Sequence, residues 1–140
     1  MASKYDSHQF ALRLKSKNIP KICYFSGEEV FLQESTLQEI EFILKDSSPE
    51  KVTFYGSTLD LNEFLSVVNS QPLFGNVTLV ILKETNKIKA TVEKNLVSQL
   101  RTNIENILIN SYVIFISSLK SFRLNQNELY KFVLETGETV

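Results

Sequence analysis

Short apolar segments alternate with longer amphipathic segments along almost the whole chain of 140 residues. The short segments are rich in apolar and strand-forming residues, which is typical of strands buried on both faces; they cover residues 22–25, 51–55, 77–82 and 112–116. The segments between them carry apolar residues at three- and four-residue spacing, as helices packed on one side do. The alternation predicts an α/β fold, a three-layer α/β/α sandwich with a mainly parallel sheet.

Capping and breaking residues set the limits of the expected helices. We expect helices over residues 7–18, from the turn at 26–29 to Leu44, over 61–68, over 91–108 and over 125–134. Thr58 or Asp60 can cap the third of these helices. Residues 1–7 are polar and expected to be loose. Residues 137–140 resemble the start of one more strand, which suggests a piece of a longer protein.

Composition excludes several classes of protein. The chain is 43% hydrophobic and 22% charged with a net charge of -1, ordinary values for one globular domain and unlike those of disordered or coiled-coil chains. It has no apolar run of membrane-spanning length and no signal peptide, so we expect a cytoplasmic protein without a membrane partner. Its single cysteine, Cys23, excludes an internal disulfide and a structural zinc site.

The turn after the first expected strand fails the tests for a nucleotide site. A phosphate loop needs a glycine, four residues, and then Gly-Lys-Ser/Thr. Counting from Gly27, those last three positions hold Leu32, Gln33 and Glu34. A nucleotide hydrolase also commonly ends an apolar strand in an acidic residue that holds magnesium. The strand at 77–82 is followed by lysine at position 83.

Other candidate catalytic groups have simpler interpretations. His8, the only histidine, has no nucleophile nearby in the sequence, and Cys23 lies within an apolar strand, where a buried thiol is inert. Glu28 and Glu29 suit the positive end of a helix. The lysines at 87, 89 and 94 lack interleaved aromatic residues, so a solvated connection is favoured over a nucleic-acid patch. We therefore expect no catalytic residue, no cofactor and no metal.

One segment favours binding to a partner. Gln71, Pro72, Leu73, Phe74 and Gly75 form an expected turn between a helix and a strand. Leu73 and Phe74 either fold back onto the core or stand in solvent, with about even weight from spacing alone. If exposed, the pair could supply roughly 3–6 kcal/mol in a partner's pocket before ordering costs.

Two motifs in their order and spacing resemble the delta subunits of bacterial DNA polymerase III. The first is Ile22-Cys23-Tyr24-Phe25-Ser26-Gly27-Glu28-Glu29-Val30-Phe31-Leu32, an apolar strand followed by Gly-Glu-Glu and an apolar pair. The second is Gln71-Pro72-Leu73-Phe74-Gly75 before an apolar strand. The resemblance covers residues 21–122 or so, and is weak on either side of them.

The resemblance implies a degenerate P-loop, AAA+-like domain over residues 21–140, with residues 1–20 as an N-terminal segment of the same domain. It implies a non-catalytic clamp-loader subunit that binds the sliding clamp (the beta subunit) and favours opening of the ring. Leu73 and Phe74 would enter the clamp's pocket, flanked by Gln71, Pro72 and Gly75. Lid and collar domains, which join the other loader subunits in the family, would be absent, and DNA would be met only through the complex.

Three other interpretations stay open. The first is a nucleotide-free α/β module that binds a different protein through Leu73 and Phe74. The second is a small enzyme that uses nucleotides or phosphate, which detectable ATP binding would favour. The third is DNA binding by residues 83–94, which a steep salt dependence would reveal.

Overall fold

The computed structural model describes residues 3–4, 19–27, 30–47, 49–70, 77–118 and 127–139. Within them, no helix is long and apolar enough to cross a membrane. Six strands form one sheet in the order β1-β6-β2-β5-β4-β3, and every neighbouring pair is parallel. The strands are β1 (Ser3–Lys4), β2 (Ile22–Ser26), β3 (Glu50–Tyr55), β4 (Thr78–Lys83), β5 (Ser111–Ser117) and β6 (Glu138–Thr139).

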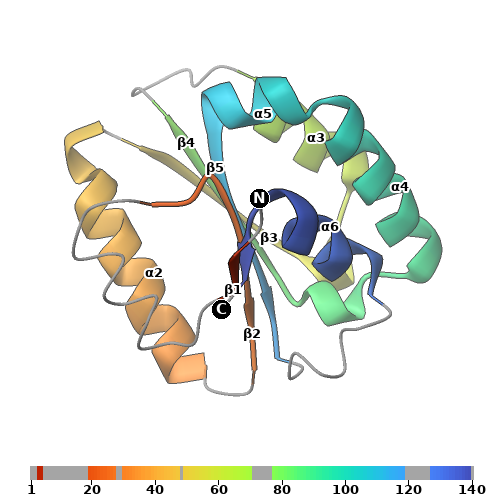
Figure 1. The fold of residues 1–140 in the computed structure, drawn as a ribbon, viewed down its shortest axis with the longest axis horizontal. Helices are drawn as coiled ribbons and strands as arrows, with labels where there is room; N and C mark the ends of the chain where they lie inside the picture. The colour runs from red at the N-terminus through yellow and green to blue at the C-terminus, as the bar shows by residue number, and fades with distance from the viewer. Residues whose placement is uncertain are drawn as a thin grey trace.

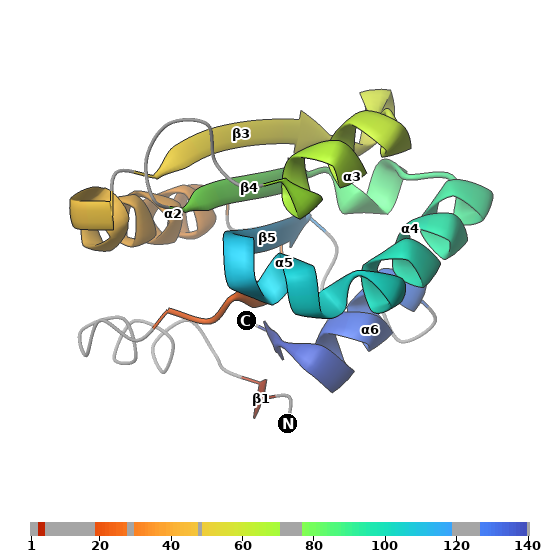
Figure 2. The ribbon, with the colours of Figure 1, turned by 90° about the horizontal axis from the view of Figure 1, so that it is seen from above.

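Helices cover both faces of this sheet. One face carries α2, and the other carries α3, α4, α5 and α6 (Figures 1 and 2). Their bounds are α2 (Val30–Leu44), α3 (Leu61–Asn69), α4 (Ala90–Thr102), α5 (Ile104–Asn110) and α6 (Glu128–Thr136), with short 3-10 helices η1 (Lys45–Ser47), η2 (Gly56–Thr58) and η3 (Thr85–Lys87). The predicted three-layer α/β/α fold with a parallel sheet is confirmed.

The strands divide their apolar side chains between two cores. Successive residues of a strand point to opposite faces, so in β2 Cys23 and Phe25 pack toward α2 while Ile22 and Tyr24 pack toward the other helices. The same division holds in β4, where Leu79 and Ile81 join the α2 core and Val80 and Leu82 join the opposite one. Burial on both faces explains why these strands are almost continuously apolar.

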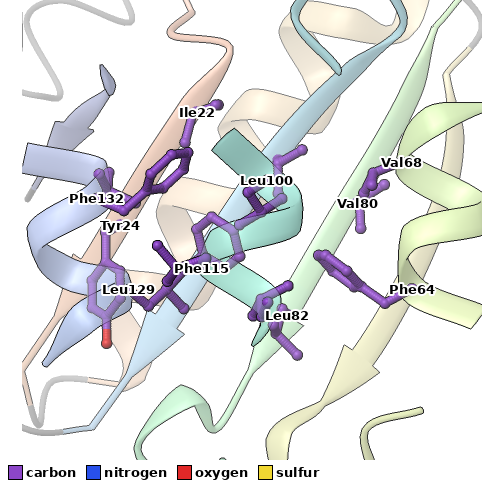
Figure 3. Close-up of a cluster of buried hydrophobic side chains, with 14 of the residues drawn as sticks. Ile22, Tyr24, Phe64, Val68, Val80, Leu82, Leu100, Phe115, Leu129 and Phe132 are labelled. Atoms are coloured by element: carbon purple, nitrogen blue, oxygen red, sulfur yellow. The ribbon is translucent and has the colours of Figure 1, made fainter. Parts of the chain in front are cut away.

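Aromatic rings fill the larger core (Figure 3). Tyr24 meets Tyr130 edge to face at 5.1 Å between ring centroids, and Phe64 meets Phe54 at 5.2 Å in the same manner. The Tyr24 hydroxyl lies 2.7 Å from the hydroxyl of the buried Thr85, so its polar end is satisfied. Burial raises the pKa of Tyr24 to about 12.

The structure differs from the sequence predictions at two places. The helix expected over 91–108 is two helices, because Asn103 leaves helical geometry with φ -105° and ψ 13°. Its backbone N–H (3.1 Å) and its side-chain amide (2.8 Å) both donate to the carbonyl of Gln99. Residues 3 and 4 were expected to be loose, but they form β1, which pairs with β6.

Of the two residues predicted as possible caps of α3, Asp60 is the one that caps it, by accepting from the backbone N–H of Glu63 (3.2 Å).

A buried carboxylate from α4 holds the start of α6. Glu93 accepts hydrogen bonds from Asn127 Nδ2 (2.8 Å) and from the backbone N–H of Glu128 (3.3 Å). Asn127 in turn caps α6 by accepting from the backbone N–H of Tyr130 (2.9 Å). Burial raises the pKa of the Glu93 carboxyl above its usual range, and the two hydrogen bonds only partly offset that effect.

We expect Glu93→Gln to remove a pH dependence from the free energy of unfolding. A raised folded-state pKa means that the folded protein favours the protonated carboxyl. That stabilisation is complete below the ordinary value of 4.5 and is lost as the pH rises through the folded-state pKa. Urea unfolding at about pH 4 and about pH 7 should show the wild type losing stability relative to the variant. A pH-independent difference between the two proteins would contradict this assignment.

Candidate functional site

The carboxyl ends of β2 and β5 form the place where an α/β sheet of this kind usually binds a ligand. The helix after β2 covers one face and the helix after β5 covers the other, so the chain diverges between two neighbouring strands. Gly27 follows β2 with a φ of 120°, a backbone conformation that suits glycine. A cavity of about 230 Å³ lies at this edge, lined by Glu34, Lys83, Glu84, Asn86, Lys87, Ile116 and Ser118.

The charged groups of this cavity neutralise one another. Lys83 Nζ, at the end of β4, lies 2.9 Å from Glu34 Oε1 of α2, and Lys87 Nζ lies 3.2 Å from Glu84 Oε2. Glu34 stands where a phosphate loop has a hydroxyl residue. Lys83 stands where a nucleotide hydrolase commonly has a carboxylate. The structure joins these two positions by an ion pair. Neither position therefore carries the group that magnesium or a phosphate requires, and the two groups present neutralise each other.

The described part of the structure gives no support for a catalytic role of the remaining candidate residues. Cys23 is fully buried, as predicted. His8, Glu28 and Glu29 lie outside the described residues. Among the residues that are described, no group of three or more His, Cys, Asp and Glu side chains could hold a metal ion.

A second polar cluster at the same edge was not predicted from the sequence. Ser57 Oγ donates to Glu84 Oε1 (2.8 Å), so η2 after β3 is tied to the residue that follows β4. These hydrogen bonds from Ser57 and Lys87 lower the pKa of the Glu84 carboxyl. Glu84 itself has a left-handed backbone, with φ 57° and ψ 41°. The Gly-Ser-Thr sequence directly after a strand is the only hint of this cluster in the sequence. The residue to which Ser57 bonds depends on which strands are neighbours in the sheet.

Gly56 permits the close approach of these two turns. A Cβ at this position would collide with the backbone carbonyl oxygen of Glu84, which a side-chain rotation cannot relieve. We expect Gly56→Ala to lower the free energy of unfolding by about 1–3 kcal/mol, the usual effect of overpacking. Chemical denaturation measures the change. Ser57→Ala is the matched control: it removes an exposed hydrogen bond without a collision and should have the smaller effect.

The predicted partner-binding turn joins elements at the opposite, amino edge of the sheet. Its residues, Gln71, Pro72, Leu73, Phe74 and Gly75, lie outside the described residues. The chain leaves α3 at Ser70, whose hydroxyl donates to the carbonyl of Ser66 (2.5 Å), and enters β4 at Thr78. The positions of these two flanks are set by the surrounding fold.

One buried and one exposed hydrogen bond fix the helix end before the turn. Ser111 Oγ, at the start of β5, donates to the carbonyl of Val68 (3.0 Å), and Asn106 Nδ2 of α5 donates to the carbonyl of Asn69 (2.8 Å). Val68 is fully buried. On α5, Leu108 and Ile109 are exposed large apolar side chains, with Ile109 at 74% exposure. The end of α3 is thus a rigid support beside a partly apolar helix surface.

Comparisons with known proteins identify the fold. A scan against models of protein families finds no match, and a search of curated proteins finds none. Among solved structures, the chain is similar to the Bacillus subtilis DNA clamp loader delta protein YqeN, with a TM-score of 0.74 and 17% sequence identity. The similarity covers 96% of this chain and 42% of the Bacillus protein, so the chain spans less than half the length of the protein it matches. The chain therefore has a clamp-loader delta-like fold.

Proposed function

We propose that this chain is the clamp-binding part of a clamp-loader delta-type subunit, acting in DNA replication. Leu73 and Phe74 insert into an apolar pocket of a ring-shaped sliding clamp, and Gln71, Pro72 and Gly75 shape the turn that presents them. The domain favours ring opening if it binds the open form of the clamp better than the closed form. Such a role implies a cytoplasmic location and binding without catalysis.

The observation that carries this proposal is the similarity of fold over 96% of the chain to a protein named as a DNA clamp loader delta protein. The motifs at 22–32 and 71–75 support it independently, because they were matched to delta subunits from residue types and spacing alone. The fixed ends of α3 and β4 add a physical argument. A turn whose two ends are anchored loses less conformational freedom on binding than one on a loose connection.

The Lys83–Glu34 ion pair favours a subunit that does not hydrolyse nucleotides over a small nucleotide-using enzyme. A triphosphate with magnesium needs a lysine in the phosphate loop and a carboxylate at the end of the strand, but the chain has Gln33 and Lys83 at these positions. Lys83 is paired with Glu34, which stands where the loop needs a hydroxyl. The remaining alternative is an α/β module that binds a protein other than a clamp through the same turn. The fold similarity gives preference to the clamp.

Direct binding to the sliding clamp of the same organism tests the proposal. Surface plasmon resonance with the clamp immobilised should show saturable binding by the wild-type chain, and calorimetry with ATP and magnesium should show none. Absence of clamp binding by the folded chain would overturn the clamp proposal and leave the other protein-binding interpretation. Tight ATP binding would instead favour the enzyme.

A further inference from the structure

A second cavity at the carboxyl edge of the sheet is lined by two lysines and two hydroxyl residues together with Gly56 and the apolar Leu59, Ile88 and Val92. It has a volume of about 270 Å³ and lies between η2, η3 and the start of α4. Ser57 and Thr58 line it from η2, and Lys87 and Lys89 line it from the segment after β4. These residues follow the ends of two neighbouring parallel strands, β3 and β4, so the sheet itself brings them together.

Positive charge exceeds negative charge around this cavity. Lys89 is exposed and forms no ion pair with any residue in the described part of the chain. Lys87 gives one of its three ammonium hydrogens to Glu84, which leaves donors for a ligand. Glu84, which bonds to Ser57 and Lys87, lines the neighbouring cavity, and in the described part of the chain no second carboxylate bonds to these residues. Two ammonium groups beside a single carboxylate leave a net attraction for anions.

The start of α4 adds directed donors on the same side. The residue that precedes this helix is Lys89, and its side chain makes no capping hydrogen bond. Backbone N–H groups in the first turn of a helix have no partner within the helix, and the helix dipole favours a negative group there. Val92, in that first turn, lines the cavity. The start of α4 therefore adds to the attraction that the two lysines exert on an anion. It is not the only feature on which the site depends.

We propose that this cavity binds a phosphate group. Lys87 and Lys89 supply charge, and the Thr58 hydroxyl and the first N–H groups of α4 supply hydrogen bonds. A phosphate presents several acceptor oxygens, which the two ammonium groups and the Thr58 hydroxyl can meet as donors. The phosphate can belong to the backbone of a single-stranded nucleic acid or to a free phosphate or mononucleotide. This cavity adjoins the Glu34–Lys83 cavity, because Lys87 lines both.

Two probes distinguish these sources. The first is inorganic phosphate, titrated at constant ionic strength against chloride while the backbone amide signals of the chain are followed by NMR. The second is a fluorescein-labelled single-stranded oligonucleotide of about 15 nucleotides, near the upper site size of a small domain, followed by anisotropy. Shifts at Thr58 and at residues 90–92 with inorganic phosphate identify a site for free phosphate. The same shifts in an NMR titration with the unlabelled oligonucleotide, and none with inorganic phosphate, identify a site for a phosphodiester backbone.

Lysine variants locate the binding. Lys89→Ala should weaken the binding of the responding probe about tenfold, equivalent to 1.4 kcal/mol. For the oligonucleotide, it should also reduce the slope of log affinity against log salt by about 0.7, the loss of one phosphate contact on a single strand. Lys94→Ala is the matched control, because Lys94 is exposed on the same helix but does not line the cavity.

Two results would overturn the proposal. One is the absence of amide shifts around the cavity with either probe. The other is an equal loss of affinity in Lys89→Ala and Lys94→Ala, since that would indicate a diffuse basic surface and not a cavity. Both lysines are exposed side chains away from the core, so circular dichroism should show the two variants folded like the wild type.

Discussion

Replacing Leu73 and Phe74 by alanine should reduce clamp affinity at least tenfold, or about 1.4 kcal/mol. Two apolar side chains of this size contribute roughly 3–6 kcal/mol when fully buried in a partner, and ordering of the turn offsets part of that gain. A small number of such anchors commonly dominates the affinity of an interface. Surface plasmon resonance of the double variant beside the wild type gives the ratio of dissociation constants.

Phe42→Ala is the matched control for this experiment. Phe42 lies on α2, is 65% exposed, and belongs to the opposite face of the sheet from α3. Its removal should leave clamp affinity unchanged, which separates loss of an anchor from loss of general surface hydrophobicity. Circular dichroism confirms that each variant is folded. Equal clamp binding by the double variant and the wild type would retain the clamp as partner and reject Leu73 and Phe74 as the contact.

The core of the fold could be predicted from the sequence because its signals are local. The run from Val77 to Leu82 is apolar at almost every position, and β4 is buried along its length from Thr78 to Leu82. Apolar residues at helical spacing likewise placed α3, whose Phe64 and Val68 are fully buried. In both segments, residue type and period point to the same element, so no distant contact is needed to decide it.

Features that depend on distant contacts could not be predicted. β1 is only two residues long, and it exists through pairing with β6, more than 130 positions away in the chain. The break at Asn103 coincides with one side-chain amide that bonds to the Gln99 carbonyl, a weak signal within an otherwise periodic helix. The sequence therefore predicts the elements better than their ends and edge pairings.

The charged residues also show the difference between what is local in the sequence and what depends on distant contacts. Glu34 and Lys83 were each recognised as unsuited to nucleotide binding, but the ion pair between them joins residues 49 positions apart. The cavity formed by Ser57, Thr58, Lys87 and Lys89 arises because β3 and β4 are neighbours in register. Sequence position shows which groups follow each strand, and only the strand order shows which of them meet.

Phe64→Ala should lower the free energy of unfolding by about 3–5 kcal/mol, the usual effect of removing a buried phenyl ring. Phe64 is fully buried, packs edge to face on Phe54 at 5.2 Å, and lies 6.4 Å from the ring of Phe115. It joins α3 to β3 and β5 at once, so neighbouring side chains cannot close the space without moving the helix. Such a loss is a large part of the 5–15 kcal/mol that typically stabilises a domain.

Urea unfolding of Phe64→Ala and Phe42→Ala side by side provides the measurement. The control removes the same ring from a position that is 65% exposed, where it contacts Lys45 with the ammonium 3.9 Å from the ring centroid, and should change stability by about 1 kcal/mol or less. Similar effects of the two substitutions would show that α3 is not anchored as described.

The milder variant Phe64→Leu links this anchoring to binding. Leucine keeps the site apolar, so the chain should remain folded while the packing of α3 is loosened. Because α3 ends at Asn69, directly before the turn that carries Leu73 and Phe74, a looser helix should present the turn less rigidly and lower clamp affinity by several-fold. The loss should be smaller than that of the Leu73→Ala/Phe74→Ala variant. Unchanged affinity in a measurably destabilised Phe64→Leu chain would mean that the turn binds independently of the helix that supports it.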